Sequence, residues 1–338
     1  MPPRRKKSIA TGDTGRPTMA DLAALAGVSK ITISRALRGS EAVHPETRER
    51  IKSLAREHGY RLNLSARNLR LQRNAMVAVV VEMQPSVERP MSEPYPLALL
   101  GGISQELTSA EYSILLMAMH ELSPERLPPV DGVILLGQGE ADEATVRIRE
   151  LGVPVVSWGA LRSGHGSLVV GSDNARGGEL AAERLLSLGR RRVVYLGNTR
   201  FGEIADRCDG LKARLEAGGA TLVECLDGGF TFLTGANAIR TLLSAGTHHF
   251  DGIFACSDLV AMGAIRALTD AGVDVPGDVA VVGFDDTPMA SYFVPALTTI
   301  RQDWHHGGLL LARKLLSLVQ GEAAQSEIMP VNLIVRSS

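Results

Sequence analysis

The distribution of apolar and polar positions divides the chain into two parts. From about residue 75 onward, short apolar runs without polar alternation are separated by longer segments with the amphipathic period of a helix. Such runs are typical of strands buried on both faces, and the segments between them are typical of helices that cover a parallel sheet. The expected strands are residues 75–82, 112–118, 132–136, 154–158, 192–197, 221–226, 252–256 and 279–284, and the expected helices are residues 97–110, 174–189, 206–218, 235–245, 259–271 and 305–321.

The length of this alternating region predicts its architecture. Residues 75–338 contain more strand and helix segments than one sheet normally needs. We therefore expect an α/β body of two similar lobes, each a doubly wound parallel sheet. Ligands of such folds bind at the carboxyl ends of the strands and in the crevice between lobes. The body is thus expected to bind a small molecule.

The N-terminal part of the chain shows a different pattern, that of short helices. Thr18 is followed three residues later by an acidic residue, which is the spacing of a capping box. Gly27 allows a sharp turn, and Ser29 can cap a second helix. A third helix is expected to begin at Pro45, because the missing N–H of proline costs nothing in a first turn. These features predict a helix-turn-helix domain at residues 18–62.

The second of these helices has a polar outer face with hydroxyls, an ammonium group and a guanidinium group. Such groups match the phosphate oxygens and base edges of a DNA major groove. An ordinary helical hairpin with a solvated polar face is the alternative interpretation. The side chains expected to contact DNA from this domain are Thr18, Ser29, Lys30, Ile31, Thr32, Ser34 and Arg35.

The charge distribution favours DNA binding. The whole chain has 36 Lys and Arg against 37 Asp and Glu, yet residues 1–74 carry 16 basic and 6 acidic side chains. The rest of the chain carries 20 basic and 31 acidic side chains. The basic part can neutralise DNA phosphates, so its binding should weaken as salt rises. Residues 1–17, rich in basic residues, Gly and Pro, are expected to form a disordered arm.

A short polar segment, residues 63–74, connects the two parts. It predicts either a short helix capped by Asn63 or a linker. Because a short helix is unstable alone in water, a partner would be needed to order it. Leu69 would then be an exposed apolar side chain close to Arg67, a combination that suits a wedge in a minor-groove step of DNA.

Composition and motifs argue against several other classes of protein. The chain is 45% apolar, as globular proteins are, and it has no apolar run long enough to span a bilayer. No secretory signal is expected, so we expect a cytoplasmic protein. Cys208, Cys225 and Cys256 lack the spacing of a metal site and are expected to be reduced thiols. We expect no metal and no cofactor. Motifs for nucleotide-binding loops, nucleophile elbows and zinc proteases are absent from the sequence. A sugar-modifying enzyme fused to a DNA-binding head is the remaining enzymatic alternative.

From about residue 18 to its end, the chain resembles the lac repressor (LacI/GalR) family of bacterial transcription regulators. The resemblance implies a headpiece, a hinge helix at residues 63–74 and a body similar to periplasmic sugar-binding proteins. It also implies a homodimer that binds a roughly palindromic double-stranded DNA operator. The segments that carry the resemblance are MADLAALAGVSKITISRAL, NLSARNL, VGSDNARGG, LGRRRV, CSDLVAMGAIRAL and VVGFDDTPMASYFVPALTTIRQD.

The resemblance assigns roles to the DNA-binding residues. Lys30 and Ile31 fall where the family selects its bases, and Leu69 falls where the intercalating leucine of the family lies. Two positions depart from the family pattern. Leu62 replaces the usual proline before the hinge, which loosens the hinge entry, and His44 replaces a usual serine cap.

The resemblance also implies an effector site between the lobes. Arg207 matches the arginine that grips the ligand, Asp285 matches an acidic residue at a strand end, and Phe230 matches an aromatic that stacks on a sugar. Trp158 replaces a more common aspartate, which removes a hydroxyl acceptor and adds a stacking face. The expected effector-binding residues are Tyr95, Trp158, Glu203, Arg207, Phe230, Ser257, Asp285 and Gln302.

This set of side chains suits a neutral sugar or oligosaccharide best. A sugar acid paired with Arg207 is the second choice, and a nucleobase is the third. Next to the expected contact Ser257, Asp258 is expected to cap the following helix. The expected mechanism is a two-state switch, in which the ligand changes the relative angle of the first lobes across the dimer and so moves the hinge segments. The sequence leaves open whether the ligand releases or promotes DNA binding, and release by an inducer is the commoner arrangement in the family.

Overall fold

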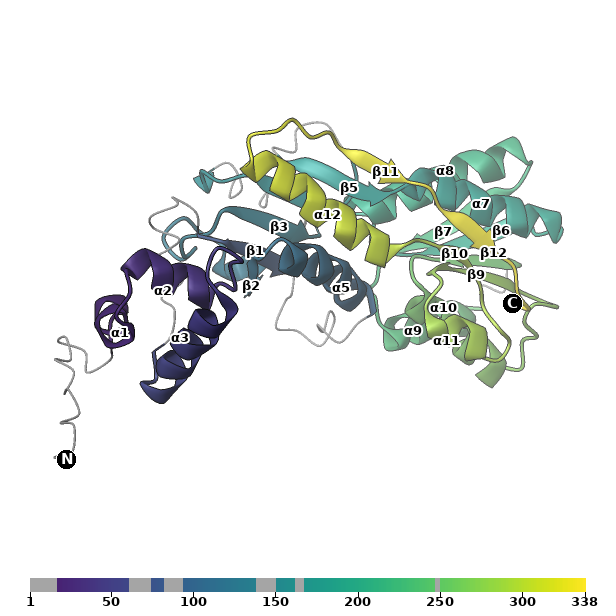
Figure 1. The fold of residues 1–338 in the computed structure, drawn as a ribbon. Helices are drawn as coiled ribbons and strands as arrows, with labels where there is room; N and C mark the ends of the chain where they lie inside the picture. The colour runs from purple at the N-terminus through teal and green to yellow at the C-terminus, as the bar shows by residue number, and fades with distance from the viewer. Residues whose placement is uncertain (1–16, 61–73, 82–93, 138–149, 162–166, 247–249) are drawn as a thin grey trace, which may run out of the picture. The chain divides into compact units, whose positions relative to one another are not determined.

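The computed structural model describes residues 17–60, 74–81, 94–137, 150–161, 167–246 and 250–338. The chain forms two compact units, which we call the headpiece (Met1–Asn74) and the body (Ala75–Ser338). Figure 1 shows that the described headpiece is helical and that the body combines helices with two sheets.

The headpiece helices begin and end at capping residues. They are α1 (Met19–Ala26), α2 (Lys30–Leu37) and α3 (Pro45–Glu57). The Thr18 hydroxyl accepts a hydrogen bond from the Asp21 amide at 3.3 Å, and the Asp21 carboxylate accepts one from the Thr18 amide at 2.8 Å. Gly27 ends α1 with φ at +65°, a conformation that glycine adopts at little cost. Ser29 caps α2 by accepting from the Thr32 amide at 3.1 Å.

A small apolar core holds the three helices together. Leu22, Ile33 and Ile51, one from each helix, are fully buried. Arg50 of α3 donates to the Ala26 carbonyl at 2.9 Å, which ties α3 to the end of α1. Because a core of this size stabilises a domain only modestly, such additional bonds matter.

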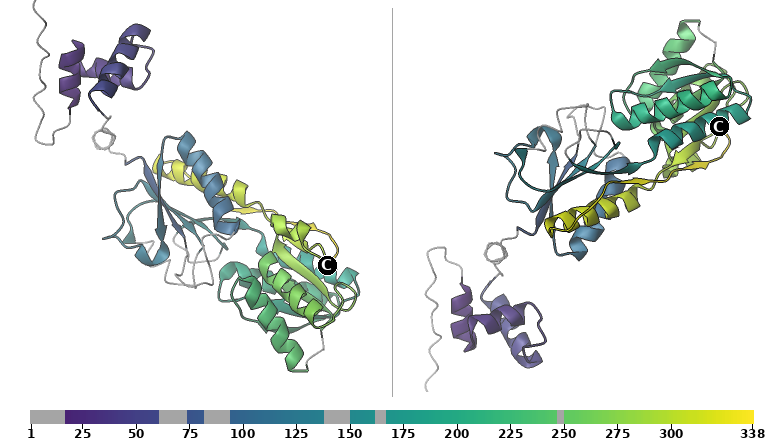
Figure 2. Two further views of the ribbon diagram at one scale, coloured as in Figure 1. Left: turned by 90° about the horizontal axis from the view of Figure 1, so that it is seen from below. Right: turned by 90° about the horizontal axis from the view of Figure 1, so that it is seen from above.

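The described residues of the body form two six-stranded sheets, one in a first lobe and one in a second lobe (Figure 2). All pairings described are parallel except that between β10 and β12. In spatial order, the first sheet contains β11 (Glu327–Met329), β5 (Leu168–Ser172), β4 (Val155–Trp158), β3 (Gly132–Leu136), β1 (Met76–Val81) and β2 (Ser113–Ala118). The second contains β12 (Asn332–Ile334), β10 (Thr298–Arg301), β9 (Ala280–Asp285), β8 (Gly252–Ala255), β6 (Arg192–Leu196) and β7 (Thr221–Leu226).

Helices cover the sheets, so the central strands are buried along their whole length. All residues of β3, β4 and β8 are buried. The first lobe has α5 (Pro94–Ser109), the 3-10 helix η1 (Met119–Glu121) and α12 (Trp304–Val319). The second lobe has α7 (Asn174–Ser187), α8 (Gly202–Ala217), α9 (Phe232–Ser244), α10 (Asp258–Asp270) and α11 (Pro288–Tyr292).

Three helix pairs pack backbone against backbone through glycine. A Cβ atom at Gly178 of α7 would overlap the Arg207 carbonyl of α8, and one at Gly210 of α8 would overlap the Ala175 carbonyl of α7. No larger residue fits at such a contact without moving a helix. Equivalent glycines lie in α9 and α10 at Gly235 and Gly263, and in α5 and α12 at Gly102 and Gly308.

The two lobes are connected where β5 leads into α7, where β10 leads into α12 and where β11 leads into β12. Hydrogen bonds join these crossovers to one another. The Asp173 amide donates to the Met329 carbonyl at 2.9 Å, which links the first crossover to the third. The Ser172 hydroxyl donates to Gln302 Oε1 at 2.8 Å, which links the first crossover to the second.

The structure confirms the predicted fold class, with parallel sheets in two lobes. The predicted strands and helices are present in the described residues, with ends that shift by a few positions. The predicted start of α8 is four residues too far along the chain, since the helix begins at Gly202 and not at Asp206. Strands β5, β10, β11 and β12 were not predicted. They have three to five residues each, too few to establish an apolar period.

Candidate functional site

A cleft lies between the two lobes of the body, next to the carboxyl ends of the strands. The space inside it, together with the open solvent at its mouth, amounts to about 1030 Å³. The structure brings all eight predicted effector residues into its lining, although their role in binding stays a prediction. They are Tyr95, Trp158, Glu203, Arg207, Phe230, Ser257, Asp285 and Gln302. Residues that the sequence did not single out also line it, namely Ser172, Asn174, Phe201, Thr287 and Trp304.

Aromatic side chains stand on both walls of the cleft. In the first lobe, the rings of Tyr95 and Trp304 meet edge to face with centroids 5.9 Å apart. In the second lobe, Phe201 and Phe230 make a similar contact at 5.6 Å. Trp158 is buried at the end of β4. Such walls can stack on the apolar C–H faces of a sugar ring or on a planar base.

The Trp158 ring depends on a glycine of α12. A Cβ atom at Gly307 would overlap this ring, so the helix leaves room for the indole only because residue 307 has no side chain. The close packing of the Trp158 ring against the backbone at Gly307 fixes the position of the ring in the lining of the cleft. The sequence could not reveal this contact, because the two residues are far apart along the chain.

Arg207 is held rigidly in the cleft by groups from three other elements. Its Nε atom donates to Asn174 Oδ1 at 2.8 Å, and its Nη1 atom donates to the Cys256 carbonyl at 2.5 Å. Its Cζ atom lies 3.5 Å from the centroid of the Phe284 ring, a cation–π contact. These bonds use two of the five guanidinium N–H donors. The remaining donors can serve a ligand, and the fixed plane orients them.

A chain of hydrogen bonds connects the acid of β9 with the crossovers. Gln302 Nε2 donates to Asp285 Oδ1 at 2.7 Å, and Gln302 Oε1 accepts from the Ser172 hydroxyl at 2.8 Å. The backbone at Asp285 and Asp286 has φ values of +123° and +56°. Such values are strained for residues with a side chain, and strain of this kind concentrates at functional sites.

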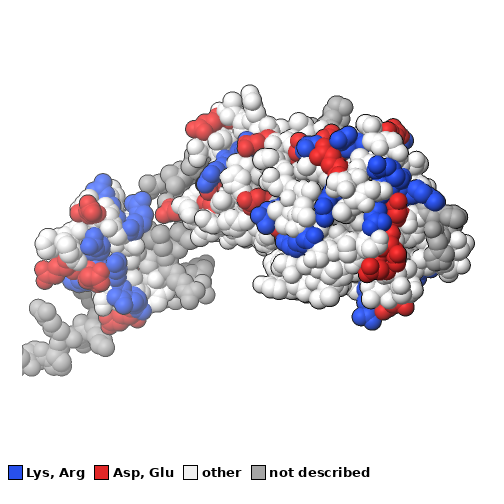
Figure 3. Space-filling view, turned by 90° about the vertical axis from the view of Figure 1, so that its right-hand side faces the viewer, with Lys and Arg blue, Asp and Glu red and all other residues white. Residues whose placement is uncertain are grey.

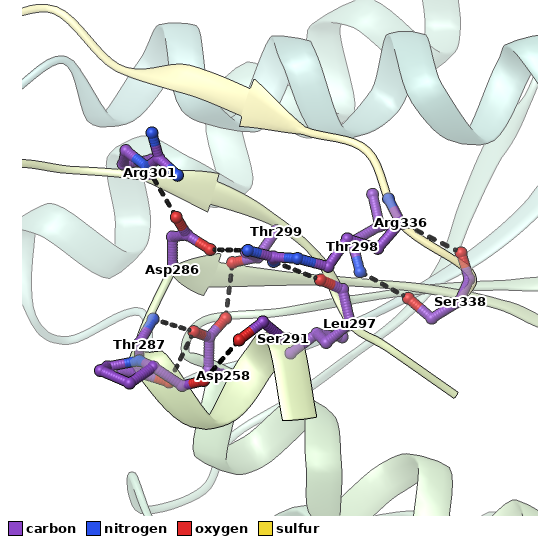
Figure 4. Close-up of polar contacts among 11 residues, drawn as sticks. Asp258, Asp286, Thr287, Ser291, Leu297, Thr298, Thr299, Arg301, Arg336 and Ser338 are labelled. Atoms are coloured by element: carbon purple, nitrogen blue, oxygen red, sulfur yellow. Dashed lines mark hydrogen bonds and ion pairs between the residues drawn. The ribbon is translucent and has the colours of Figure 1, made fainter. Parts of the chain in front are cut away.

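The turn after β9 is anchored by ion pairs (Figure 4). The Asp286 carboxylate accepts from Arg301 Nε at 2.6 Å and from Arg336 Nη2 at 2.5 Å. Arg336 also donates to the Leu297 carbonyl at 2.7 Å. These contacts hold the strained turn, and with it the adjacent Asp285, in one position.

Asp258 lies beneath this turn and is completely buried. Its carboxylate accepts from the Thr287 amide at 2.7 Å, the Thr287 hydroxyl at 3.0 Å and the Thr299 hydroxyl at 2.5 Å (Figure 4). Burial raises the pKa of Asp258 from its ordinary 3.8 to about 6, against the opposing effect of these hydrogen bonds. The prediction that Asp258 caps α10 is wrong, because the cap is Ser257, which accepts from the Val260 amide at 3.4 Å.

The headpiece presents the predicted recognition face on α2. Lys30 and Arg35 are exposed, and Ile31 is 65% exposed although it is apolar. An apolar side chain at the first turn of such a helix suits contact with a thymine methyl group. Thr32 and Ser34 are half-buried.

Two of the other predicted DNA contacts, Thr18 and Ser29, lie in the described part of the headpiece. Thr18 and Ser29 are exposed but act as helix caps in the structure. Asn63, Arg67 and Leu69 lie outside the described residues, so the prediction of a hinge helix remains one from the sequence alone.

Three further properties of the described residues concern surface charge, metal-ligating groups and membrane-spanning helices. On the face of the body shown in Figure 3, basic and acidic side chains are interspersed. Within the described ranges, no group of three or more His, Cys, Asp and Glu side chains is placed to hold a metal ion. Among the helices of those same ranges, none has the length and apolar character needed to cross a membrane.

A helix-turn-helix unit combined with a two-lobed α/β body and an interlobe cleft defines a class of ligand-responsive DNA-binding regulators. Comparison with known proteins agrees with this class. Residues 18–63 match the model for bacterial regulatory proteins of the lacI family, and residues 182–338 match the model for a periplasmic binding protein-like domain.

Relatives cover nearly the whole chain. The HTH-type transcriptional regulator CelR of Thermobifida fusca is 34% identical over 96% of this chain and 98% of its own. The regulator GntR of Pseudomonas aeruginosa is 33% identical over 97% of each. The chain therefore belongs to the lacI family of bacterial regulatory proteins. It is a DNA-binding transcriptional regulator and not an enzyme.

Solved structures show the same fold. A CelR–cellobiose complex is 32% identical, covers 96% of this chain and 100% of its own, and superposes with a TM-score of 0.71. A lac repressor dimer bound to operator is 24% identical, covers 95% of this chain and 98% of its own, and has a TM-score of 0.83.

Proposed function

We propose that the protein is a transcriptional repressor whose affinity for a roughly palindromic operator is controlled by a small sugar in the interlobe cleft. The observation that carries this proposal is the cleft lining, in which aromatic walls from both lobes enclose a fixed arginine and two carboxylates. Rings cover the C–H faces of a sugar, and the charged groups bond to its hydroxyls. Because operator DNA lies in the cytoplasm of a bacterium, we propose that the protein acts there.

A neutral sugar or oligosaccharide fits the charges of the cleft better than a sugar acid. Glu203 and Asp285 bring two carboxyl groups to the lining, whereas Arg207 brings one guanidinium group and already bonds to two protein oxygens. A further carboxylate on the ligand would meet like charges. The complex of CelR with cellobiose supports a sugar of this kind. A sugar acid that pairs with Arg207 is the second candidate, and a nucleobase is the third.

We also propose that the protein acts as a homodimer, as in the solved lac repressor dimer. Met289 and Tyr292 of α11 are 57% and 79% exposed, and the neighbouring Val294 is 85% exposed. Apolar side chains gathered in this way on one segment are typical of a protein interface. An effector that changes operator affinity would contribute a coupling free energy of about 1–3 kcal/mol, or roughly 5- to 150-fold in affinity.

The two tryptophans of the chain provide a direct test of ligand binding, because both Trp158 and Trp304 line the cleft. Intrinsic fluorescence is followed while cellobiose, glucose, maltose, gluconate and adenine are added in turn. A saturable change with a neutral sugar is expected. In the Glu203→Gln variant this response should weaken, and in the Asp209→Asn variant, changed at an exposed acid of the same helix, it should not. A saturable response to gluconate alone would contradict the preference for a neutral ligand.

The regulatory role is tested on DNA. Operator sequences are selected from random duplexes with the purified protein, and binding of the selected duplex is measured by fluorescence anisotropy with and without the sugar found above. The proposal expects a palindromic consensus and a sugar-dependent dissociation constant. Operator affinity that stays constant at saturating sugar would refute control through the cleft.

A further inference from the structure

Two cysteine thiols of the second lobe lie in contact with each other. Cys208 is in α8 and Cys225 is in β7, and their Sγ atoms are 3.9 Å apart. Cys208 is buried, whereas Cys225 is exposed to solvent. Neither belongs to the cleft lining, and the third cysteine, Cys256, is buried there. The spacing of the three cysteines along the chain matches no known motif, so it indicates no pair among them.

An irregularity in β7 brings Cys225 to its position. Val193 of β6 pairs with Leu222, and Tyr195 pairs with Cys225, so Val223 has no residue opposite it. Side chains alternate between the faces of a strand, and two residues three positions apart normally point to opposite faces. The extra residue cancels one alternation. Cys225 therefore lies on the same face as Leu222 and Tyr195.

That face is the one covered by α8 (Figure 1). The hydroxyl of Tyr195 donates to the Ile204 carbonyl of α8 at 2.8 Å, which shows that the helix packs over this side of β6. Cys208 comes one turn further along α8. The register shift thus directs Cys225 toward Cys208, and without it Cys225 would point to the other face of the sheet.

The contact makes the two thiols chemically unequal. The hydrogen bond with Cys208 lowers the pKa of Cys225. The same bond, together with burial, raises the pKa of Cys208. A thiolate is the reactive form of cysteine. The exposed Cys225 is therefore the nucleophile of the pair, and the buried Cys208 can react only with a partner that is already next to it.

We propose that Cys208 and Cys225 form an oxidation-sensitive dithiol, which hydrogen peroxide converts into an intramolecular disulfide. The Cys225 thiolate attacks one peroxide oxygen, so an S–O bond forms, the O–O bond breaks and hydroxide leaves. The Cys208 sulfur then attacks the resulting sulfenic acid, so the S–S bond forms and the S–O bond breaks. The Cys208 proton leaves with the departing oxygen as water. In total, two thiols lose two electrons and two protons, and one peroxide becomes two waters.

Closure of this disulfide would act on the helix that carries the effector arginine. A disulfide brings its sulfur atoms to about 2 Å, so α8 and β7 must adjust from the present contact. Arg207 directly precedes Cys208, and Glu203 lies one turn before Arg207 on the same helix. Oxidation would therefore alter the geometry of the cleft. This consequence rests on the function proposed above for the cleft, whereas the disulfide chemistry itself does not.

The test uses the full-length reduced protein treated with hydrogen peroxide and then alkylated under denaturing conditions. We expect a mass loss of two hydrogens and one remaining alkylatable thiol. Trypsin cuts after Arg207, Lys212, Arg214 and Arg240, so a linked pair of peptides, residues 208–212 and residues 215–240, should appear and should disappear on reduction. The peptide with Cys256 should carry the alkyl group. Untreated protein, with three alkylated cysteines, is the matched control.

Two variants test the order of the steps. In Cys208→Ser, peroxide should leave a sulfenic acid on Cys225, which dimedone traps as an adduct. In Cys225→Ser, the buried Cys208 should give no adduct at the same peroxide concentration. A wild-type protein that keeps three alkylatable thiols, or that links through Cys256 or between chains, overturns the proposal. An adduct on Cys208 instead of Cys225 overturns it as well. None of these measurements requires an effector or DNA, so they are independent of the proposed function.

Discussion

The buried carboxyl group of Asp258 makes the stability of the body depend on pH. Burial raises its pKa in the folded state to about 6, while the unfolded chain keeps the ordinary value near 3.8. The folded state therefore binds more protons than the unfolded state between these values, and its stability falls as pH rises through them. The shift of about two pKa units corresponds to about 3 kcal/mol in total. This contribution is fully present below about pH 4 and is lost above about pH 6.

The variant Asp258→Asn removes the titration and keeps a side chain of the same shape. An amide oxygen can still accept from the Thr287 amide, which the carboxylate accepts at 2.7 Å. We expect the free energy of unfolding of the variant to increase relative to that of the wild type by about 2 kcal/mol between pH 4 and pH 7, because only the wild type loses stability over this range. Most of the total change falls in this window.

Guanidinium unfolding followed by far-UV circular dichroism at a series of pH values measures this difference. Asp209→Asn, at an exposed acid of α8, is the matched control and should show no such trend. A difference between Asp258→Asn and the wild type that is the same at pH 4 and pH 7 would refute the assignment.

Three further predictions concern other parts of the chain. Ser29→Ala removes the cap of α2 and should lower the unfolding free energy of the headpiece by about 1 kcal/mol in a guanidinium titration, whereas Ser40→Ala, which caps no helix, should not. Gly178→Ala places a Cβ atom against the Arg207 carbonyl and should destabilise the body by about 1–3 kcal/mol in the same assay. An unchanged unfolding midpoint would show that α7 and α8 can move apart without cost. Lys30→Ala should reduce affinity for the selected operator by about 1–3 kcal/mol and relax base preference at one position, which repeated selection would reveal; equal losses on operator and random DNA would make Lys30 a phosphate contact.

Local patterns predicted most of the fold because they report burial directly. The run from Val77 to Val81 is apolar at every position, and the structure buries all five residues. Caps at Thr18 and Ser29 were also visible, since they depend on residues three positions apart. The short strand β10 was missed because two of its four residues are threonines whose hydroxyls are satisfied by distant groups.

The cleft shows where local patterns stop being informative. Trp304 and Phe201 line it, although the sequence pattern singled out neither. Trp304 is the first residue of α12, which was expected to begin one residue later. Phe201 directly precedes α8, whose start was predicted at Asp206 instead of Gly202. Their position in the cleft follows from how the lobes are connected. The contact between Cys208 and Cys225 is a stronger case, because it requires a register shift between two strands that no pattern in β7 indicates.

The hydrogen-bond chain from Ser172 through Gln302 to Asp285 gives the cleft a means of responding to a ligand. Ser172 and Gln302 belong to two different crossovers, and a bond of 2.8 Å joins them in the arrangement of the lobes seen here. Gln302 in turn orients the Asp285 carboxylate at 2.7 Å, on a strained backbone that ion pairs hold in place. A ligand shifts an equilibrium only by the difference between its affinities for the two states. Under the proposed function, a hydroxyl group bound to Asp285 meets an acceptor whose orientation depends on the crossovers. Its binding free energy therefore differs between lobe arrangements, which is the condition that a ligand-controlled repressor must satisfy.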